Sequence, residues 1–166
     1  YKRKISRESV IAAAHIVARH ELRGRYDFIF DNPYETRDDM LQTARLIVNL
    51  PKPYIFQPFS LTFFPGTDLY DRAKKDGIIV DERTQIYEKQ GNGFFASDVT
   101  YLKLVCILLP RIPRSLGRIL LLGPLVFVLH RTAFIGFYGM IYRIIAYVKE
   151  RLHISVKGLY KKHATI

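Results

Sequence analysis

The sequence has few residues from which a metal centre or a disulfide could be built. Its 166 residues include one cysteine, Cys106, and no tryptophan. A single cysteine can form neither an intramolecular disulfide nor a multi-cysteine metal site, so we expect no metal site within this chain. Cys106 lies in the apolar run 102–109, and free cysteine packs as a small hydrophobe. We therefore expect a buried, structural thiol in a protein from a reducing compartment.

Acidic residues are scarce in the second part of the chain. Residues 1–98 carry 15 Lys and Arg against 14 Asp and Glu, whereas residues 99–166 carry 11 against the single acid Glu150. This asymmetry predicts two regions, a mixed-charge domain over 1–98 and a basic, apolar helical extension over 99–166. Basic residues without opposing acids favour an anionic partner.

The first region alternates between helical and strand patterns. In order, the periodicity and capping residues predict a helix over 6–23, a strand over 26–31, a helix over 36–50, a strand over 54–64 and a helix over 67–75. Tyr26, Phe28 and Phe30 share one face of the first strand, and we expect the helix over 36–50, which starts with a capping box at 36–39, to cover them. In the second strand Pro58 cannot donate a backbone hydrogen bond, which predicts a bulge or irregular pairing there. The two strands start 28 residues apart, which indicates right-handed βαβ units and a parallel sheet. Because two strands cannot close a sheet, and because the chain opens on Tyr1 without a signal peptide, we expect a fragment of a longer protein.

The second region has a different pattern. The segment 78–99 is polar and irregular, with a loop at 91–93, and apolar helical runs follow at 101–109, 119–129 and 133–148. The last two runs are shorter than the roughly 18 to 20 residues that cross a bilayer. We therefore expect helices that lie on a surface or pack against the first region.

Two motifs follow the predicted strands. The first, 29–36, reads Ile-Phe-Asp-Asn-Pro-Tyr-Glu-Thr, and it lies at the strand-to-helix edge where α/β proteins place ligands. The second, 59–67, is a strand that runs into a Pro-Gly-Thr turn. Together they resemble radical S-adenosylmethionine (SAM) enzymes of the cobalamin-binding subgroup, in which a late strand ends in a pattern like I-x-G-x-P-x-E-T. Asp31 stands where many members have glycine.

The resemblance implies a fold and an activity. It implies the carboxyl-terminal part of a TIM-type radical SAM barrel over 1–98, followed by the α-helical extension. The intact protein would be an enzyme that cleaves SAM with a 4Fe–4S cluster, and cobalamin would be a further cofactor. The cluster ligands, a C-x-x-x-C-x-x-C motif, and any cobalamin domain would lie outside this chain, so we expect the chain alone to be inactive. Neither the catalytic residues nor the substrate follows from the sequence.

The resemblance also implies which residues contact the cofactor or a small-molecule substrate. Ile29 would pack on the adenine of SAM, Asp31 and Asn32 would donate or accept hydrogen bonds, and Ser60 and Thr62 would supply neutral polar contacts from one strand face. Each residue also has a purely structural interpretation. Ile29 fits an apolar core, Glu35 and Thr36 fit a helix start, and Asp27 needs a charged partner if it is buried.

Alternatives stay open for both the partner and the function of the chain. The basic extension suits an anionic membrane surface, with a cytoplasmic protein resting on the inner face of the membrane. Its helices could instead pack on the first region while the Arg heads reach water. Nucleic acid is not an expected partner, because the tyrosines of this region lie in apolar sequence.

A non-catalytic membrane-associated or scaffold protein is the second functional hypothesis. A hydrolase using Asp31 and Glu35 is a third, which the lack of an activating partner nearby disfavours.

Overall fold

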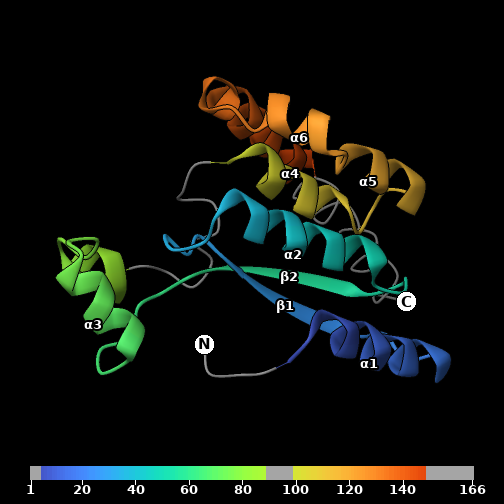
Figure 1. Cartoon of the computed structure of the whole chain (residues 1–166), viewed down its shortest axis with the longest axis horizontal. Helices are drawn as coiled ribbons and strands as arrows, with labels where there is room; N and C mark the ends of the chain where they lie inside the picture. Colours follow the sequence, from blue (N-terminus) through green and yellow to red (C-terminus); the bar gives the residue numbers. More distant parts are fainter. Residues whose placement is uncertain (1–4, 89–98, 149–166) are drawn as a thin grey trace, which may run out of the picture.

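The computed structural model describes residues 5–88 and 99–148, which form a small parallel sheet and a set of helices (Figure 1). The elements in chain order are α1 (Arg7–Arg19), β1 (Arg25–Phe30), α2 (Arg37–Asn49), β2 (Ile55–Ser60), α3 (Asp68–Lys75), the π-helical turn η1 (Arg83–Tyr87), α4 (Tyr101–Leu108), α5 (Arg114–Leu120), α6 (Gly123–Leu129) and the 3-10 turn η3 (Thr132–Phe134). A helix over 135–148, here called the outer helix, follows. The predicted loop at 91–93 and the basic residues beyond 148 lie outside the described residues.

The two strands pair in parallel, as the sequence predicted. Their register runs from Arg25 opposite Ile55 to Phe30 opposite Ser60, without the bulge expected at Pro58. The Ile55 amide donates to the Gly24 carbonyl, and the Leu61 amide donates to the Phe30 carbonyl. Amides of odd-numbered β2 residues therefore face β1, since hydrogen-bonding direction alternates along a strand. Pro58 has an even number, so its missing N–H falls on the edge that β1 does not use.

One face of the sheet is covered and the other is accessible. Tyr26, Phe28 and Phe30 pack into the main core, and the rings of Phe28 and Phe56 lie 5.2 Å apart. The opposite face, here called the open face, carries the alternate residues of both strands: Arg25, Asp27, Ile29, Ile55, Gln57 and Phe59. Side chains alternate along a strand, so Tyr26, Phe28 and Phe30 share one face. The prediction that α2 covers this face is confirmed.

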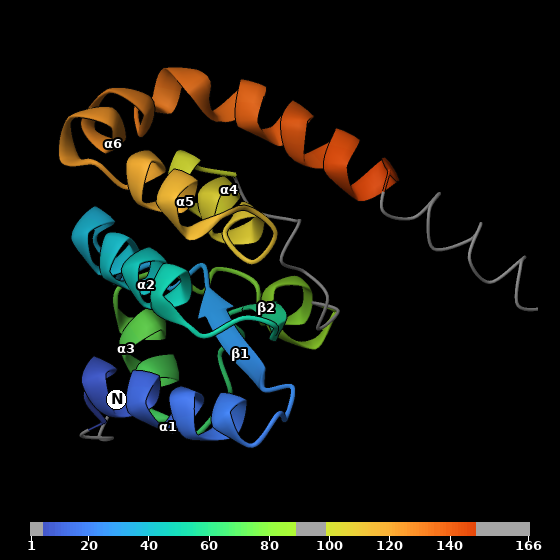
Figure 2. The same ribbon diagram turned by 90° about the vertical axis from the view of Figure 1, so that its right-hand side faces the viewer.

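The expected partial TIM-type barrel is wrong. Within the described residues the only sheet has two strands, β1 and β2, and most of the remaining structure is helical. A TIM barrel closes through eight strands, each followed by a helix. Here the apolar residues that follow α3 and η1 form the helices α4, α5 and α6 instead of further strands, and these helices stack outward on α2 (Figures 1 and 2).

The central helix α2 lies between the sheet and the outer helices. Its cap is the predicted box, in which Thr36 accepts from the Asp39 amide and the Asp39 carboxylate accepts from the Thr36 amide. Ala44, Ile47 and Val48 are almost completely buried. One core joins the sheet and α2 to α4 and α6, so both sequence regions contribute to it.

The helical region is broken more often than predicted. The apolar run 119–129 does not form one helix, because α5 ends at Leu120 and α6 begins at Gly123, with Pro124 in its first turn. Proline suits the first turn of a helix but interrupts an interior, which explains the break. None of the helices in residues 5–88 and 99–148 is both long and apolar enough to cross a bilayer.

A small second cluster lies at the end of the sheet from which β2 leads into α3. Tyr70 and Ala73 of α3 pack with Ile79 and Ile86. Lys74 and Tyr70 both donate to the Glu82 carboxylate, which ties α3 to the segment around η1. This unit projects away from α4, α5, α6 and the outer helix, here called the helical layer (Figure 1).

Close packing of α5 predicts a stability effect at Gly117. An added Cβ would meet Leu109 Cδ2 at 2.7 Å and Val48 Cγ2 at 2.8 Å, and both side chains are buried. Gly117→Ala should therefore destabilise the fold by about 1 to 3 kcal/mol, the usual cost of overpacking. Gly139→Ala is the matched control, because no atom lies within 4 Å of its added Cβ, and it should stabilise by roughly 0.5 to 1 kcal/mol. Urea unfolding followed by circular dichroism measures both, and equal effects would contradict this packing.

Candidate functional site at the carboxyl edge of the sheet

The ends of the two strands are fixed by backbone hydrogen bonds. Asp31 directly follows β1 and adopts a left-handed conformation with φ of 64°, which aspartate tolerates better than most residues. Asn32 Oδ1 accepts from the Tyr34 amide at 3.1 Å, and the Glu35 amide donates to the Asn32 carbonyl at 3.0 Å. The loop between β1 and α2 is thus a structured turn at the edge where parallel strands end.

A buried ion pair joins this edge to the helical layer. Lys103 Nζ of α4 lies 2.7 Å from Asp31 Oδ1, and the two side chains are 1% and 17% exposed. A lysine in an apolar helix loses its hydration, which is costly unless an acid compensates the charge. The left-handed turn at Asp31 brings the carboxylate to this ammonium. Among the described residues Asp31 Oδ2 is buried and has no hydrogen-bond partner, so the edge retains an acceptor oxygen.

Further acids surround this pair. Partial burial raises the pKa of Glu35, and the charges of Asp39 and Asp31 raise it further. The hydrogen bonds from the Thr36 hydroxyl and amide lower the pKa of Asp39. Glu35 is therefore within electrostatic range of both Asp31 and Asp39, at the start of α2.

The carboxyl end of α6 brings a histidine toward the start of α2. Burial lowers the pKa of His130, and the positive charge of Arg37 lowers it further. His130 Nδ1 is buried and lacks a hydrogen-bond partner within the described part of the chain. The imidazole is therefore neutral near pH 7, and it is a second buried polar group with spare hydrogen-bonding capacity.

Tyr34 connects the edge to α3. Its hydroxyl donates to Asp76 Oδ2 at 2.8 Å, and the Arg72 guanidinium lies 4.0 Å from the centre of its ring. Partial burial raises the pKa of Tyr34, and the bond to Asp76 adds to this effect. These contacts hold the α3 unit against the loop that carries Asp31 and Asn32.

The structure separates the residues that the resemblance assigned to cofactor contact. Ile29 is 53% exposed on the open face, next to Phe59 in the strand register. Asp31 turns toward α4, and Asn32 stabilises its own loop. Ser60 is 9% exposed and shares the covered face with Phe30. Thr62 is half-buried beyond the end of β2. Ile29, Asp31 and Asn32 are thus grouped at one edge, whereas Ser60 lies on the other side of the sheet.

Sequence reasoning missed Lys103. It is the one charged residue in the run 101–109, and a lone lysine among apolar residues indicates either a break in the buried face or a buried partner. Its partner Asp31 lies 72 positions earlier, so the pair follows only from the tertiary structure. Asp27, which the sequence marked as needing a partner, is exposed and lies 3.7 Å from Arg25 Nε.

The described residues do not form a metal centre. No group of three or more His, Cys, Asp or Glu side chains within 5–88 and 99–148 is arranged to hold an ion. Cys106 is buried, and this burial raises the pKa of its thiol to about 12, as expected for a structural cysteine. The described residues therefore do not fit an iron–sulfur cluster. Ile29 offers exposed apolar surface beside the polar edge.

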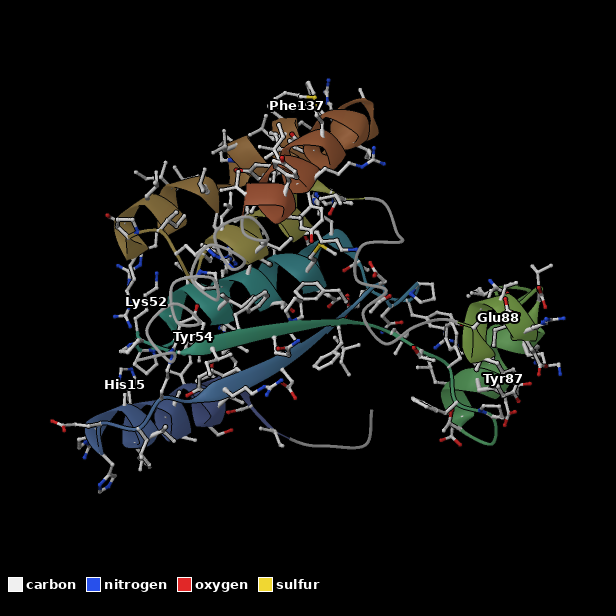
Figure 3. The ribbon with its side chains drawn as sticks, turned by 180° about the vertical axis from the view of Figure 1, so that it is seen from behind. His15, Lys52, Tyr54, Tyr87, Glu88 and Phe137 are labelled. Atoms are coloured by element: carbon white, nitrogen blue, oxygen red, sulfur yellow. The ribbon has the colours of Figure 1, made fainter. Side chains whose placement is uncertain are left out.

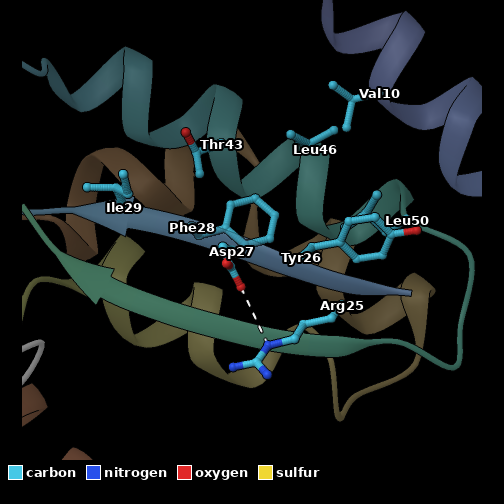
Figure 4. Close-up of a pocket in the computed structure, with 9 residues that line it drawn as sticks. All are labelled: Val10, Arg25, Tyr26, Asp27, Phe28, Ile29, Thr43, Leu46 and Leu50. Atoms are coloured by element: carbon cyan, nitrogen blue, oxygen red, sulfur yellow. Dashed lines mark ion pairs between the residues drawn. The ribbon is translucent and has the colours of Figure 1, made fainter. Parts of the chain in front are cut away.

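A pocket of about 610 Å³ lies along the edge of β1 that does not pair with β2 (Figure 4). Residues 25–29 form its floor, and α1 and α2 contribute Val10, Leu46 and Leu50. Its one ion pair, between Arg25 and Asp27, is exposed. Because the buried polar groups gather at the carboxyl edge, we take that edge as the candidate functional site.

No protein-family model, curated protein or solved structure matches this chain. The assignment of function therefore depends on the motifs and on the geometry of the edge.

The first prediction at this edge concerns the energetic coupling of Lys103 and Asp31. Lys103→Met and Asp31→Asn each leave one buried charge without compensation, so each should destabilise by about 3 kcal/mol or more. The double variant should cost less than the sum, with a coupling of roughly 2 kcal/mol. Urea unfolding of the four proteins measures this double-mutant cycle.

The control cycle uses Lys74→Met and Glu82→Gln, because this pair has the same 2.7 Å separation but its side chains are 60% and 35% exposed. Exposed pairs contribute about 1 kcal/mol or less. Similar coupling in both cycles would show that Lys103 and Asp31 do not form a buried pair in solution.

The second prediction concerns His130 and pH. Its pKa in the folded state lies below its unfolded value of about 6.5, so the unfolded chain binds the proton more readily. Relative to His130→Gln, the wild-type protein should lose stability as the pH falls through 6.5, until the folded-state pKa is reached. Urea midpoints between neutral pH and pH 5.5 provide the test. His15→Gln is the control, since His15 is exposed. A wild-type protein and a His130 variant that respond identically to pH would contradict a buried neutral imidazole.

Proposed function

We propose that this chain is the carboxyl-terminal portion of a radical SAM enzyme and contributes contacts to SAM or substrate. The observation that carries the proposal is the parallel pairing of the two motif segments, which sets Ile29 beside Phe59 and Phe30 beside Ser60. The motifs lie about 30 positions apart in the sequence, yet they end at the same edge, where parallel α/β structures bind their ligands.

The side chains at this edge support the proposed contacts. Ile29 is exposed and apolar, which suits packing against an adenine ring. Among the described residues the buried Asp31 Oδ2 has no hydrogen-bond partner, and Asn32 is the direct neighbour of Asp31 in the turn. Lys103 contacts Asp31 rather than the open face, so we assign it a positioning role.

When bound, a 4Fe–4S cluster would supply the electron for reductive cleavage of SAM, and in the subgroup that the motifs resemble cobalamin would supply methyl transfer. We place the ligands of both metal cofactors outside this chain. The share of this chain is to bind and orient the nucleoside part of SAM, or the substrate beside it. A cytoplasmic location is part of the same proposal.

The test uses the intact polypeptide that carries this chain together with the cluster cysteines, reconstituted without oxygen. Ile29→Asp should weaken SAM binding about tenfold, because it removes roughly 1 to 2 kcal/mol of apolar contact. Equilibrium dialysis measures the affinity, and the 5′-deoxyadenosine formed under reduction reports the activity.

Ile16→Asp is the matched control, because Ile16 is 55% exposed on α1 and Ile29 is 53% exposed on β1. It should bind SAM like the wild-type protein. If Ile29→Asp also binds SAM normally, or if the intact protein cleaves no SAM, the proposed function is wrong.

A further inference from the structure

The outer helix is apolar on two sides. Tyr138 and Tyr142 are buried against the core. Phe137, Met140 and Ile144, by contrast, are each more than half exposed. A helix that packs on one side only normally has polar residues on its other side. Figure 3 shows Phe137 at the side of the molecule away from the sheet. This second apolar side has no partner within the described residues.

The neighbouring helix α6 also exposes apolar side chains, and the Tyr138 hydroxyl of the outer helix donates to the Leu129 carbonyl at the end of α6. Phe127 and Val128 are 60% and 51% exposed, and α6 contacts α4 in the same outer layer (Figure 2). We define the apolar patch as Phe127, Val128, Phe137, Met140 and Ile144. Exposed apolar patches of this kind on a folded protein usually mark an interaction surface.

The charges of this layer have one sign. Residues 99–148 contain no Asp or Glu. The Arg131 guanidinium lies 6.0 Å from the centre of the Phe127 ring, and Arg143 is an exposed residue of the outer helix. The only lysine of this range, Lys103, points inward to Asp31. The layer therefore presents apolar side chains together with arginines that form no ion pair within the described part of the chain.

We propose that α6 and the outer helix lie on an anionic membrane surface, with the apolar patch in the headgroup region and Arg131 and Arg143 beside the lipid phosphates. Basic residues flanking exposed apolar ones are the combination that interfacial helices use. Within residues 5–88 and 99–148, no helix is both long and apolar enough to cross a bilayer. A second copy of the chain fits less well, because two such layers would bring arginines together without any acid to compensate them. This inference does not depend on the proposed SAM chemistry.

The experiment is co-sedimentation of the full chain with vesicles. Equimolar phosphatidylcholine and phosphatidylglycerol should bind the protein, whereas pure phosphatidylcholine should bind it much more weakly. Raising the salt concentration should weaken binding, because it screens the arginine–phosphate attraction. The charge variant Arg131→Gln with Arg143→Gln should bind roughly thirtyfold more weakly, since each of the two basic residues near such a surface contributes about 1 kcal/mol.

The apolar variant replaces Phe137, Met140 and Ile144 with Ser and should lose most vesicle binding. Its control replaces Ile16, Leu22 and Val80 with Ser, three residues that are also more than half exposed but lie outside the helical layer. Circular dichroism confirms that each variant is folded. Failure of the wild-type chain to bind anionic vesicles would overturn the proposal, and so would unchanged binding by the apolar variant. A dimer in light scattering that the apolar variant abolishes, without vesicle binding, would assign the patch to a second copy instead.

Discussion

The ammonium of Lys103 lies inside an apolar helix, where it requires a negative charge within hydrogen-bonding distance. That charge comes from Asp31, which reaches it because the chain turns through a left-handed conformation at the end of β1. The pair fixes the position of α4 relative to the sheet edge, and α4 packs on α2. The Lys103–Asp31 ion pair therefore joins the candidate site to the helical layer, and α2, which lies between the sheet and that layer, contributes to the same apolar core.

The local elements were predictable because their signals are local. The alternation of Tyr26, Phe28 and Phe30 identified a strand with one covered face, and the capping box at Thr36 marked the start of α2. The parallel pairing followed from the spacing of the two strands. The register was less predictable. Pro58 suggested a bulge, but its nitrogen faces the edge of β2 that does not pair with β1, so no hydrogen bond to β1 is lost.

The larger arrangement was not predictable from the same signals. The barrel expectation extrapolated from two strands to a closed sheet, but the apolar residues after α3 stack as helices on α2. The contact between Lys103 and Asp31 spans 72 positions, and no local pattern specifies it. Ser60 shows the same limit at the site. Its strand position was correct, but the face it occupies depends on the strand register, and that face is covered.

The two accessible surfaces of the molecule differ in character and lie on opposite sides of α2 (Figures 1 and 2). The open face of the sheet carries the ion pair of Arg25 and Asp27 together with the exposed Ile29. The helical layer carries the apolar patch and arginines without acids. If the helical layer rests on lipid, the open face points toward water, because α2 separates the two. A charged, water-soluble ligand such as SAM would then approach the sheet without crossing the lipid headgroups, so the two proposals require different surfaces and are geometrically compatible.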